Sequence, residues 1–392
     1  MRKAGFIVLG AALTLTAGMV ATAQNKGTIK IASQSPLSGP QSQLGEAIKL
    51  GVQLAVRDFG KVIVSQGFKL EYQPEDDQAT PTVGTANANR LVNDPDLLAV
   101  VGHLNSGVAR PSSLVYDKVG LASVSPANTA VDLTERGLKT YSRICGRDDV
   151  QGPTGARYLT QDLKAKTFFV VNDKTAYGQG VADAFAGEVK KLGGTVMENT
   201  GIPSDETDFS AVLNRVAALK PDVVYYGGLY PQAGPMLKQM REKGITSIFS
   251  GADGLDSSDF ETLAGKENLN GVIFTTTAVP LSQFALGKKF AADYQKAFGK
   301  PAESYSIYGY DATRVVLTGI ANAIRANKGA RPSRQAVAAA IRKVDLVGLT
   351  GHIQFNSKGD LLAAKYVVLK IGADGYRNAK IVKVLTVQAP GQ

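Results

Sequence analysis

Hydroxyl and amide side chains follow three of the expected strands, at the points where helices should begin. These stretches are residues 35–40 (SPLSGP), 102–107 (GHLNSG) and 125–129 (SPANT). Ligands of open parallel sheets bind at the carboxyl ends of the strands, and free N–H groups at helix N-termini attract carboxylates. Ser, Thr and Asn at helix starts commonly act only as N-caps, but three such junctions in one half of the chain predict an anion-binding pocket.

Aromatic and acidic residues occupy comparable places in the second half. Tyr177 follows the apolar run 167–172, the stretch 225–230 (YYGGLY) ends another apolar run, and Asp253 follows residues 247–250. A carboxylate among aromatic rings can hold an ammonium group. Asp253 is equally compatible with an ordinary turn residue. The two halves together are consistent with a ligand that carries both a carboxylate and an ammonium group.

Residue types for catalysis and metal binding are scarce. The chain has one Cys and two His, and neither His lies in a metal-ligand spacing. It contains no G-x-S-x-G elbow and no P-loop. Cys145 is expected to be a buried structural thiol, since such thiols pack as small apolar groups. We therefore expect no catalytic residues, no metal, no disulfide and no cofactor.

Gly178 and Gly180 imitate part of a dinucleotide-binding fingerprint, with Glu198 about 20 residues further on. These glycines lie too far beyond Asn172 for a tight turn from strand to helix. The third glycine position is Asp183, whose side chain would crowd helix–strand packing. A nucleotide site is therefore not expected.

The elements that must position these residues alternate along the chain. Short apolar runs and helical patterns follow one another over residues 30–145 and again over 150–275. This alternation predicts an α/β protein with parallel sheets covered by helices on both faces. After residue 280, helices are expected at 283–298, 304–327 and 334–343, and strands at 353–355, 365–371 and 380–384. We interpret this tail as completing both halves.

Composition and charge narrow the function further. Of 392 residues, 44% are hydrophobic and 20% charged, which is ordinary for a soluble globular protein and excludes intrinsic disorder. The formal net charge is +10, but Lys and Arg are scattered and form no stripe interleaved with aromatics. Nucleic acid is therefore not an expected partner.

The N-terminus predicts export. Arg2 and Lys3 precede an apolar run over residues 4–20, and residues 21–23 (ATA) form an A-x-A cleavage site. We expect a signal peptide over residues 1–23, cleaved after Ala23. Residue Gln24 is not Cys, so a lipid anchor at the cleavage point is not indicated.

Several of these stretches, in order, carry a family resemblance that covers nearly all of the chain after residue 23. The sequence resembles the branched-chain amino-acid-binding proteins of bacterial ABC importers, the leucine/isoleucine/valine-binding type. The motifs that carry it are residues 35–40 with Gly45, 102–106, 125–130, 149–153, 172–178, 225–228 and 359–360.

The resemblance implies a type I periplasmic binding protein fold, with two Rossmann-like lobes and the ligand in the cleft between them. Lobe 1 would comprise residues 24–147 and 279–352. Lobe 2 would comprise residues 148–278 and 353–392, the last segment completing its sheet. The chain would cross between the lobes three times.

The resemblance also implies roles for single residues. Ser106, Ala127 and Thr129 would hold the ligand's carboxylate, and Tyr177 and Asp253 its ammonium group. Other positions depart from the family pattern. Leu229 stands where some members have an aromatic residue, and Tyr230 follows one position later. Asn105 and Ala79 stand where some members have a cysteine pair, and Leu44 matches a position that walls the side-chain pocket.

We therefore expect a monomeric periplasmic protein that captures a branched-chain or other neutral amino acid by hinge closure. It would deliver this ligand to an ABC permease in the inner membrane. One alternative is a binding protein for an aromatic or short-chain carboxylate without an amine, although a buried Asp253 facing an anion would be costly. A second alternative, an exported amidase or hydrolase, lacks a nucleophile–base pair.

Overall fold

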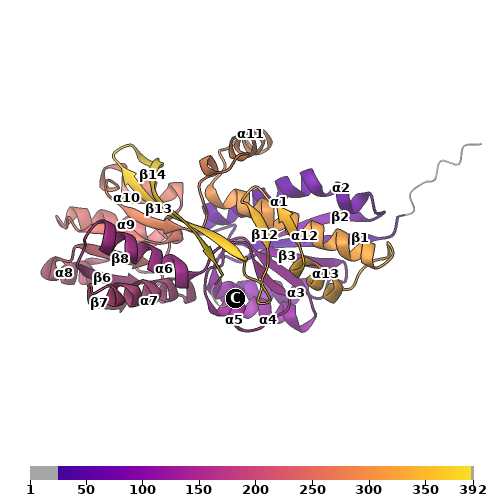
Figure 1. The fold of residues 1–392 in the computed structure, drawn as a ribbon, viewed down its shortest axis with the longest axis horizontal. Coiled ribbons are helices and arrows are strands. Elements are labelled where there is room, and N and C mark those ends of the chain that lie inside the picture. The colour runs from indigo at the N-terminus through magenta and orange to yellow at the C-terminus, as the bar shows by residue number, and fades with distance from the viewer. Residues whose placement is uncertain (1–24, 390–392) are drawn as a thin grey trace, which may run out of the picture.

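Two β-sheets, one in each half of the molecule, form the framework of the structure (Figure 1). The computed structural model describes residues 25–389. The expected signal peptide, residues 1–23, lies outside this range. We call the half that contains the first sheet lobe 1 and the half that contains the second sheet lobe 2.

The sheet of lobe 1 is parallel throughout and has the strand order β2-β1-β3-β4-β5. Its strands are β1 (Thr28–Ser35), β2 (Lys69–Asp76), β3 (Leu97–Gly102), β4 (Ala122–Ser125) and β5 (Tyr141–Arg143). The helices packed with it are α1 (Ser42–Phe59), α2 (Lys61–Val64), α3 (Pro81–Leu91), α4 (Ser106–Lys118), α5 (Asp132–Glu135), α12 (Ser304–Ala326) and α13 (Arg334–Arg342).

The sheet of lobe 2 has the order β14-β13-β10-β9-β8-β6-β7. Its strands are β6 (Thr167–Asn172), β7 (Thr195–Gly201), β8 (Val223–Gly227), β9 (Ile248–Gly251), β10 (Ile273–Thr276), β13 (Ala363–Gly372) and β14 (Gly375–Gln388). The five strands β6–β10 are parallel, as predicted, whereas β13 and β14 are antiparallel additions from the C-terminal tail. The helices of this half are α6 (Asp148–Arg157), α7 (Ala176–Lys191), α8 (Ser210–Leu219), α9 (Tyr230–Glu242) and α10 (Ser258–Ala264).

Successive residues of each strand enter cores on opposite faces of the sheet, because strand side chains alternate. In β1, Ile31 packs in the core shared with α1 and α12, whereas Ala32 packs with residues of α3 and α4. In β6, Phe168 packs in the core with α6 and α7, whereas Phe169 joins the core on the other face. Both strands are therefore covered on both faces, as parallel sheets require.

Two helices begin earlier than their apolar patterns predict. The apolar pattern over residues 181–191 predicts a helix from residue 181, but α7 begins at Ala176, because Thr175 acts as N-cap and its side chain accepts a hydrogen bond from the Gly178 N–H at 3.0 Å. The pattern over residues 236–243 predicts a helix from residue 236, but α9 begins at Tyr230, with proline in its first turn. Both corrections place a tyrosine, Tyr177 or Tyr230, in the first turn of a helix.

The chain passes between the two halves three times. The first passage runs from β5 to α6, and the second runs from β10 toward α11 (Gly287–Phe298) and α12. The third follows the small hairpin of β11 (Asp345–Val347) and β12 (His352–Gln354) and enters β13. Figure 1 shows β13 and β14, in yellow, extending from lobe 2 toward the middle of the molecule.

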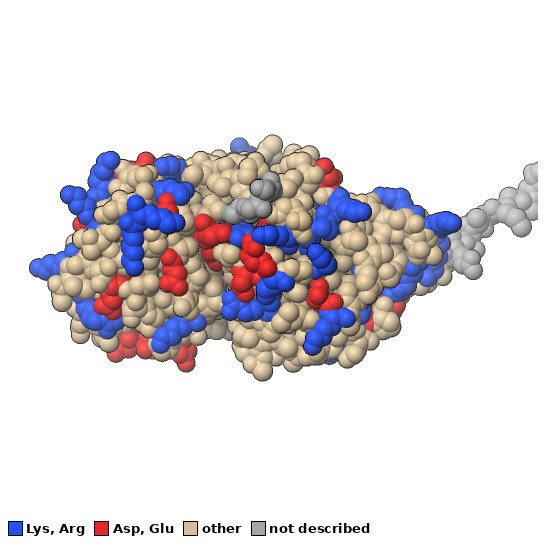
Figure 2. All heavy atoms as spheres, turned by 60° about the horizontal axis from the view of Figure 1, so that its bottom comes forward, with Lys and Arg blue, Asp and Glu red and all other residues tan. Residues whose placement is uncertain are grey.

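The surface shows no concentration of basic residues on the face drawn in Figure 2, where Lys and Arg are interspersed with Asp and Glu over both halves. Within residues 25–389, none of the helices combines the length and apolar character needed to cross a membrane.

Candidate ligand-binding site

A cavity of about 450 Å³ lies between the two halves, near the carboxyl ends of their parallel strands. Seven of the nine residues proposed from the sequence line it. From lobe 1 these are Leu44, Asn105, Ser106 and Ala127, and from lobe 2 they are Tyr177, Leu229 and Asp253. The fold therefore brings together residues that lie up to 209 positions apart in the chain, as expected for a cleft between two α/β lobes.

Asp253 is the acid of the cavity. It follows β9, begins a short 3-10 helix (Asp253–Leu255) and is 3% exposed. Its Oδ1 accepts hydrogen bonds from the Tyr177 hydroxyl at 2.7 Å and from Gln151 Nε2 at 3.0 Å, and its Oδ2 accepts one from the Tyr305 hydroxyl at 2.7 Å. Burial raises the pKa of Asp253, and the three donors partly offset this rise. An ionised carboxylate buried at a cavity wall favours a cation beside it.

A second acid, Asp148, is buried near Asp253 at the start of α6. Within the described residues, neither of its carboxylate oxygens has a hydrogen-bond partner. Burial, followed by the charge of Asp253, raises the pKa of Asp148 well above its ordinary value. Two neighbouring acids repel each other when both are ionised. A cation in the cavity beside them offsets this repulsion and stabilises their charged forms.

In contrast to the two acids, the start of α4 offers hydrogen-bond donors and a positive dipole end. The first N–H groups of a helix lack partners within the helix and carry the positive end of its dipole. Among the described residues no side chain caps this helix, and Asn105 instead donates from Nδ2 to Gln41 Oε1 at 2.7 Å. Ser106, its first residue, accepts the Ala130 N–H on Oγ at 3.4 Å. This end of the cavity suits a carboxylate.

Apolar side chains also line the cavity. Leu44 of α1 and Leu229, which precedes α9, line the cavity together with Leu104. Gly45 allows α1 to approach the preceding loop, since a Cβ at this position would lie 1.7 Å from the Pro36 carbonyl oxygen. The close approach fixes the start of α1 and, with it, the position of Leu44.

Thr129 and Tyr230 are not among the residues that line the cavity. Thr129 is fully buried, and within the described residues its Oγ1 has no hydrogen-bond partner. The hydroxyl of Tyr230 donates to the Pro40 carbonyl at 2.7 Å and thereby joins the two halves. A direct contact of either residue with a ligand stays a prediction.

Sequence reasoning missed several polar residues at or near the cavity, among them Gln41, Gln151 and Tyr305. Gln41 and Tyr305 line the cavity, and Gln151 binds Asp253 from α6. Gln151 lies in one of the motifs of the family resemblance, but nothing in its neighbours indicates a role. Tyr305 is the second residue of α12, after the second passage between the halves, so only the tertiary structure brings it to Asp253.

The remaining chemical candidates have structural explanations. Cys145 is buried, its Sγ donates to the Asn128 carbonyl at 3.3 Å, and burial raises the pKa of its thiol. Gly178 allows α7 to pack against the end of β8, since a Cβ there would lie 2.4 Å from the Gly227 carbonyl oxygen. Within residues 25–389 no cluster of three or more His, Cys, Asp or Glu residues could hold a metal ion.

Comparisons with known proteins agree with this fold. A family model described as "Periplasmic binding protein" matches residues 28–376. An amino acid binding protein of Pseudomonas aeruginosa is 34% identical over 358 residues, which cover 91% of this chain and 94% of that protein. The Leu/Ile/Val-binding protein BraC3 of Rhizobium johnstonii is 35% identical over 362 residues, covering 91% and 96%.

A solved structure shares the whole architecture. The leucine-binding protein LivK of Thermotoga maritima superposes with a TM-score of 0.82 at 28% sequence identity, and the match covers 91% of this chain and 99% of that one.

Proposed function

Because the chain belongs to the periplasmic binding protein family, we propose that it captures a free amino acid in its cleft and passes it to an ABC importer. Full-length relatives are named for amino acids or for leucine, isoleucine and valine, which supports this class of ligand. A branched-chain or other neutral amino acid is the ligand we propose. The family acts in transport and not in catalysis, in keeping with the absence of a nucleophile–base pair in the sequence.

One observation carries the proposal: the two ends of the cavity have opposite chemistry. Asp253 lies at one end with Tyr177 and Tyr305, and the uncapped start of α4 lies at the other with Ser106. An α-amino acid carries an ammonium group and a carboxylate on one carbon. Such a zwitterion satisfies both ends at once, whereas a simple carboxylate leaves the buried acid without an opposite charge.

The division between lobes gives a mechanism for capture. In this proposal Ser106, Ala127 and Thr129 of lobe 1 bind the carboxylate, and Asp253 and Tyr177 of lobe 2 bind the ammonium group. Asn105, Leu44, Leu229 and Tyr230 surround the side chain or close the cleft. A ligand held by both lobes favours the closed arrangement, and hinge motion at the three passages permits the change.

The lobes are proposed to divide as the family resemblance implies, at residues 147/148 and 278/279. The hairpin of β11 and β12 extends past the third expected boundary at 352/353. We therefore propose that the third passage lies near Leu361, just before β13. The closed pair of lobes would then present one surface to a permease in the inner membrane, with the protein acting as a monomer.

The protein acts in the periplasm, as its family does, and removal of residues 1–23 by cleavage after Ala23 is part of the proposal. Mass spectrometry of the protein isolated from the periplasmic fraction tests this point. A mature chain that begins at Gln24 is expected, and a retained N-terminus would overturn the cleavage site.

A thermal-shift screen tests the ligand class. The protein is first unfolded and refolded to remove any bound ligand, and then tested against the twenty amino acids and a set of aromatic and short-chain carboxylates. A ligand that binds only the native state stabilises it by about 2.7 kcal/mol at 100 times its Kd. A shift with neutral amino acids is expected. A shift confined to amine-free carboxylates would overturn the proposed ligand and favour the alternative.

A further inference from the structure

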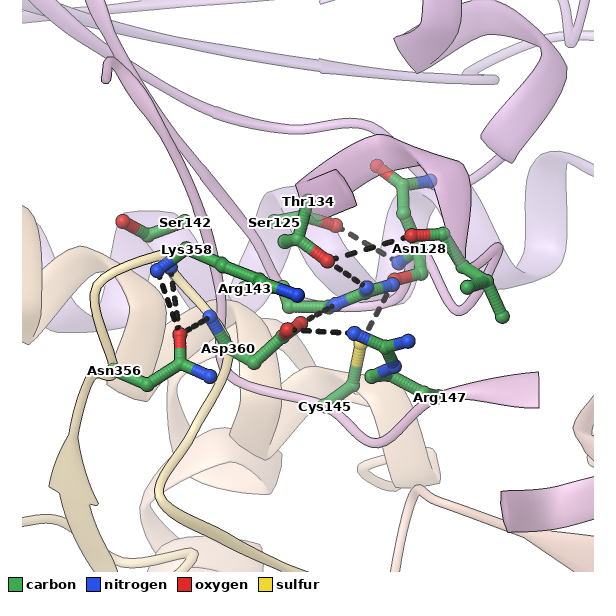
Figure 3. A network of polar contacts seen from close by, with 12 residues as sticks. Ser125, Asn128, Thr134, Ser142, Arg143, Cys145, Arg147, Asn356, Lys358 and Asp360 are labelled. Atoms are coloured by element: carbon green, nitrogen blue, oxygen red, sulfur yellow. Dashed lines mark hydrogen bonds and ion pairs between the residues drawn. The ribbon is translucent and has the colours of Figure 1, made fainter. Parts of the chain in front are cut away.

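A fully buried guanidinium lies against the loop that joins β4 to α5, the loop that carries Ala127 and Thr129 (Figure 3). It belongs to Arg143, the last residue of β5. Its Nη1 donates to the Asn128 carbonyl at 3.0 Å and to the Ala130 carbonyl at 2.8 Å, and its Nη2 donates to Thr134 Oγ1 at 2.6 Å. One side chain therefore holds this loop at two points and the helix that follows it, α5, at a third.

These contacts fix the direction of a peptide unit. In a trans peptide the C=O and the N–H point in opposite directions, and the peptide between Asn128 and Thr129 is trans. Because the Asn128 carbonyl points at Arg143, the Thr129 N–H points away from it. Ala127, two residues earlier in the same loop, lines the cavity, whereas Arg143 does not.

The guanidinium is itself held by the third passage between the lobes. Arg143 Nε donates to Asp360 Oδ1 at 2.6 Å, and the Arg143 N–H donates to the Gly359 carbonyl at 2.9 Å. Arg147 Nη1 binds the other oxygen, Asp360 Oδ2, at 2.9 Å. Burial alone would raise the pKa of Asp360, but the two guanidinium groups hold it below its ordinary value. The carboxylate therefore stays charged and keeps Arg143 in place.

The turn that carries Asp360 is ordered by the side chain of Asn356. Asn356 Oδ1 accepts the N–H groups of Lys358, Gly359 and Asp360 at 3.0, 2.9 and 3.0 Å (Figure 3). Hydrogen bonds thus run without interruption from the third passage, through Asp360 and Arg143, to the loop beside the cavity.

We propose that Arg143 is a positioning residue for the carboxylate end of the ligand: it orients the Thr129 N–H toward the cavity, and Asp360 couples this orientation to the third passage. The inference rests on the proposed function, since it requires a ligand with a carboxylate. It assigns to this buried pair a part in recognition in addition to its part in holding the fold.

Lysine cannot replace arginine here. The planar guanidinium reaches the two carbonyls, Thr134 and Asp360 with donors in fixed directions, whereas an ammonium group is a single point with three donors. Arg143→Lys keeps the charge and loses the geometry. Asp360→Asn keeps the shape and loses the charge that fixes Arg143. Both variants are expected to affect the carboxylate end more than the ammonium end.

The test compares two ligands that differ only at the carboxylate. Titration calorimetry measures Kd for L-leucine and for L-leucinamide, which keeps the side chain and the ammonium group. The ratio of the leucinamide Kd to the leucine Kd is expected to fall about tenfold or more in Arg143→Lys and in Asp360→Asn, which is about 1.4 kcal/mol of discrimination. A change that weakened the fold alone would affect both ligands equally.

Arg147→Lys is the matched control. Arg147 shares Asp360 with Arg143 and is also buried, but it makes no hydrogen bond to the carbonyls of the loop. In Arg147→Lys the ratio of the leucinamide Kd to the leucine Kd is expected to stay within about twofold of the wild-type value. A twofold change corresponds to a few tenths of a kcal/mol. An equal fall in Arg147→Lys and Arg143→Lys would overturn the specific role of Arg143.

A measurement on the unaltered protein covers the case in which the variants do not fold. The backbone amide signal of Thr129 is followed by NMR on addition of leucine and of leucinamide. A large downfield shift of its proton with leucine and a clearly smaller one with leucinamide are expected. Equal shifts, or no shift with leucine bound, would overturn the inference, whereas failure of wild-type protein to bind any amino acid would overturn the proposed function.

Discussion

Tyr230 of lobe 2 and Pro40 of lobe 1 meet across the cleft, where the tyrosine hydroxyl donates a hydrogen bond to the proline carbonyl at 2.7 Å. A second bridge lies nearby. Gln43 Nε2 donates to Ser258 Oγ at 3.2 Å, and Gln43 Oε1 accepts from Ser257 Oγ at 2.9 Å. All of these bonds join the loop before α1, or α1 itself, to helices of lobe 2. They stabilise the arrangement of the two lobes in this structure.

Tyr230→Phe is expected to shift the ligand-free protein toward an open arrangement, because it removes one bond between lobes worth about 0.5–1.5 kcal/mol. The radius of gyration from small-angle X-ray scattering should rise, and ligand affinity should fall by a similar energy. Tyr225→Phe is the control: within the described residues the hydroxyl of Tyr225 is buried without a hydrogen-bond partner. If both variants scatter like the wild type, Tyr230 has no part in closure.

Asp253→Asn is expected to weaken amino acid binding by about 2–5 kcal/mol, the range for truncating one partner of a buried charge pair. The amide retains the size of the carboxylate but cannot neutralise an ammonium group. Asp259→Asn removes an acid from α10 that does not line the cavity, and should bind as the wild type does. Calorimetric titration of the wild type, Asp253→Asn and Asp259→Asn measures these affinities. Equal affinities in all three would show that Asp253 does not contact the ligand.

Asp256 gives the fold a pH dependence of known sign. Burial raises its pKa from 3.8 to about 7, although hydrogen bonds from Tyr376 and Thr276 oppose the rise. The folded state therefore holds this proton more tightly than the unfolded state does. The stability that Asp256 contributes is fully present below pH 3.8 and is lost as the pH rises through about 7.

Melting temperatures at pH 5 and pH 8 test this expectation. The wild type should lose more stability between these values than Asp256→Asn, because the amide does not ionise. An identical loss in the two proteins would show that other groups cause the pH dependence.

Leu229→Ala is expected to change which side chain the cavity prefers. Removing apolar atoms from a ligand pocket costs about 1–3 kcal/mol per methylene-sized contact. Affinity for leucine should therefore fall, while affinity for alanine, whose side chain is too short to depend on this wall, should change little. Competition titrations with the two amino acids measure the change, and an equal effect on both would place Leu229 away from the ligand's side chain.

The sequence predicts the framework well because its signals are local. The apolar run 167–172 is a strand with these same bounds, and the junctions after β3 and β4 lie beside the cavity as expected. Helix starts are less accurate, since the cap at Thr175 and the proline after Tyr230 extend α7 and α9 beyond their apolar patterns. The first residue of each helix is set by its N-cap or by proline, and the periodicity of apolar residues does not detect these.

Contacts made by residues far apart in the chain were beyond prediction from the sequence. Tyr305 meets Asp253 only because the second passage returns the chain to lobe 1. Arg143 and Asp360, 217 positions apart, are joined by the third passage. Neither side chain lies in a local pattern that indicates a partner, so the structure was required to find them.

The central claim is that the cleft holds a zwitterion by both of its charged groups. Titration calorimetry of ligand-free protein, with the amino acid that gives the largest thermal shift and with its des-amino and decarboxylated analogues, tests this claim most directly. The account predicts that each analogue binds at least about 100-fold more weakly, a difference of about 2.7 kcal/mol. A des-amino analogue that binds as tightly as the amino acid would contradict it.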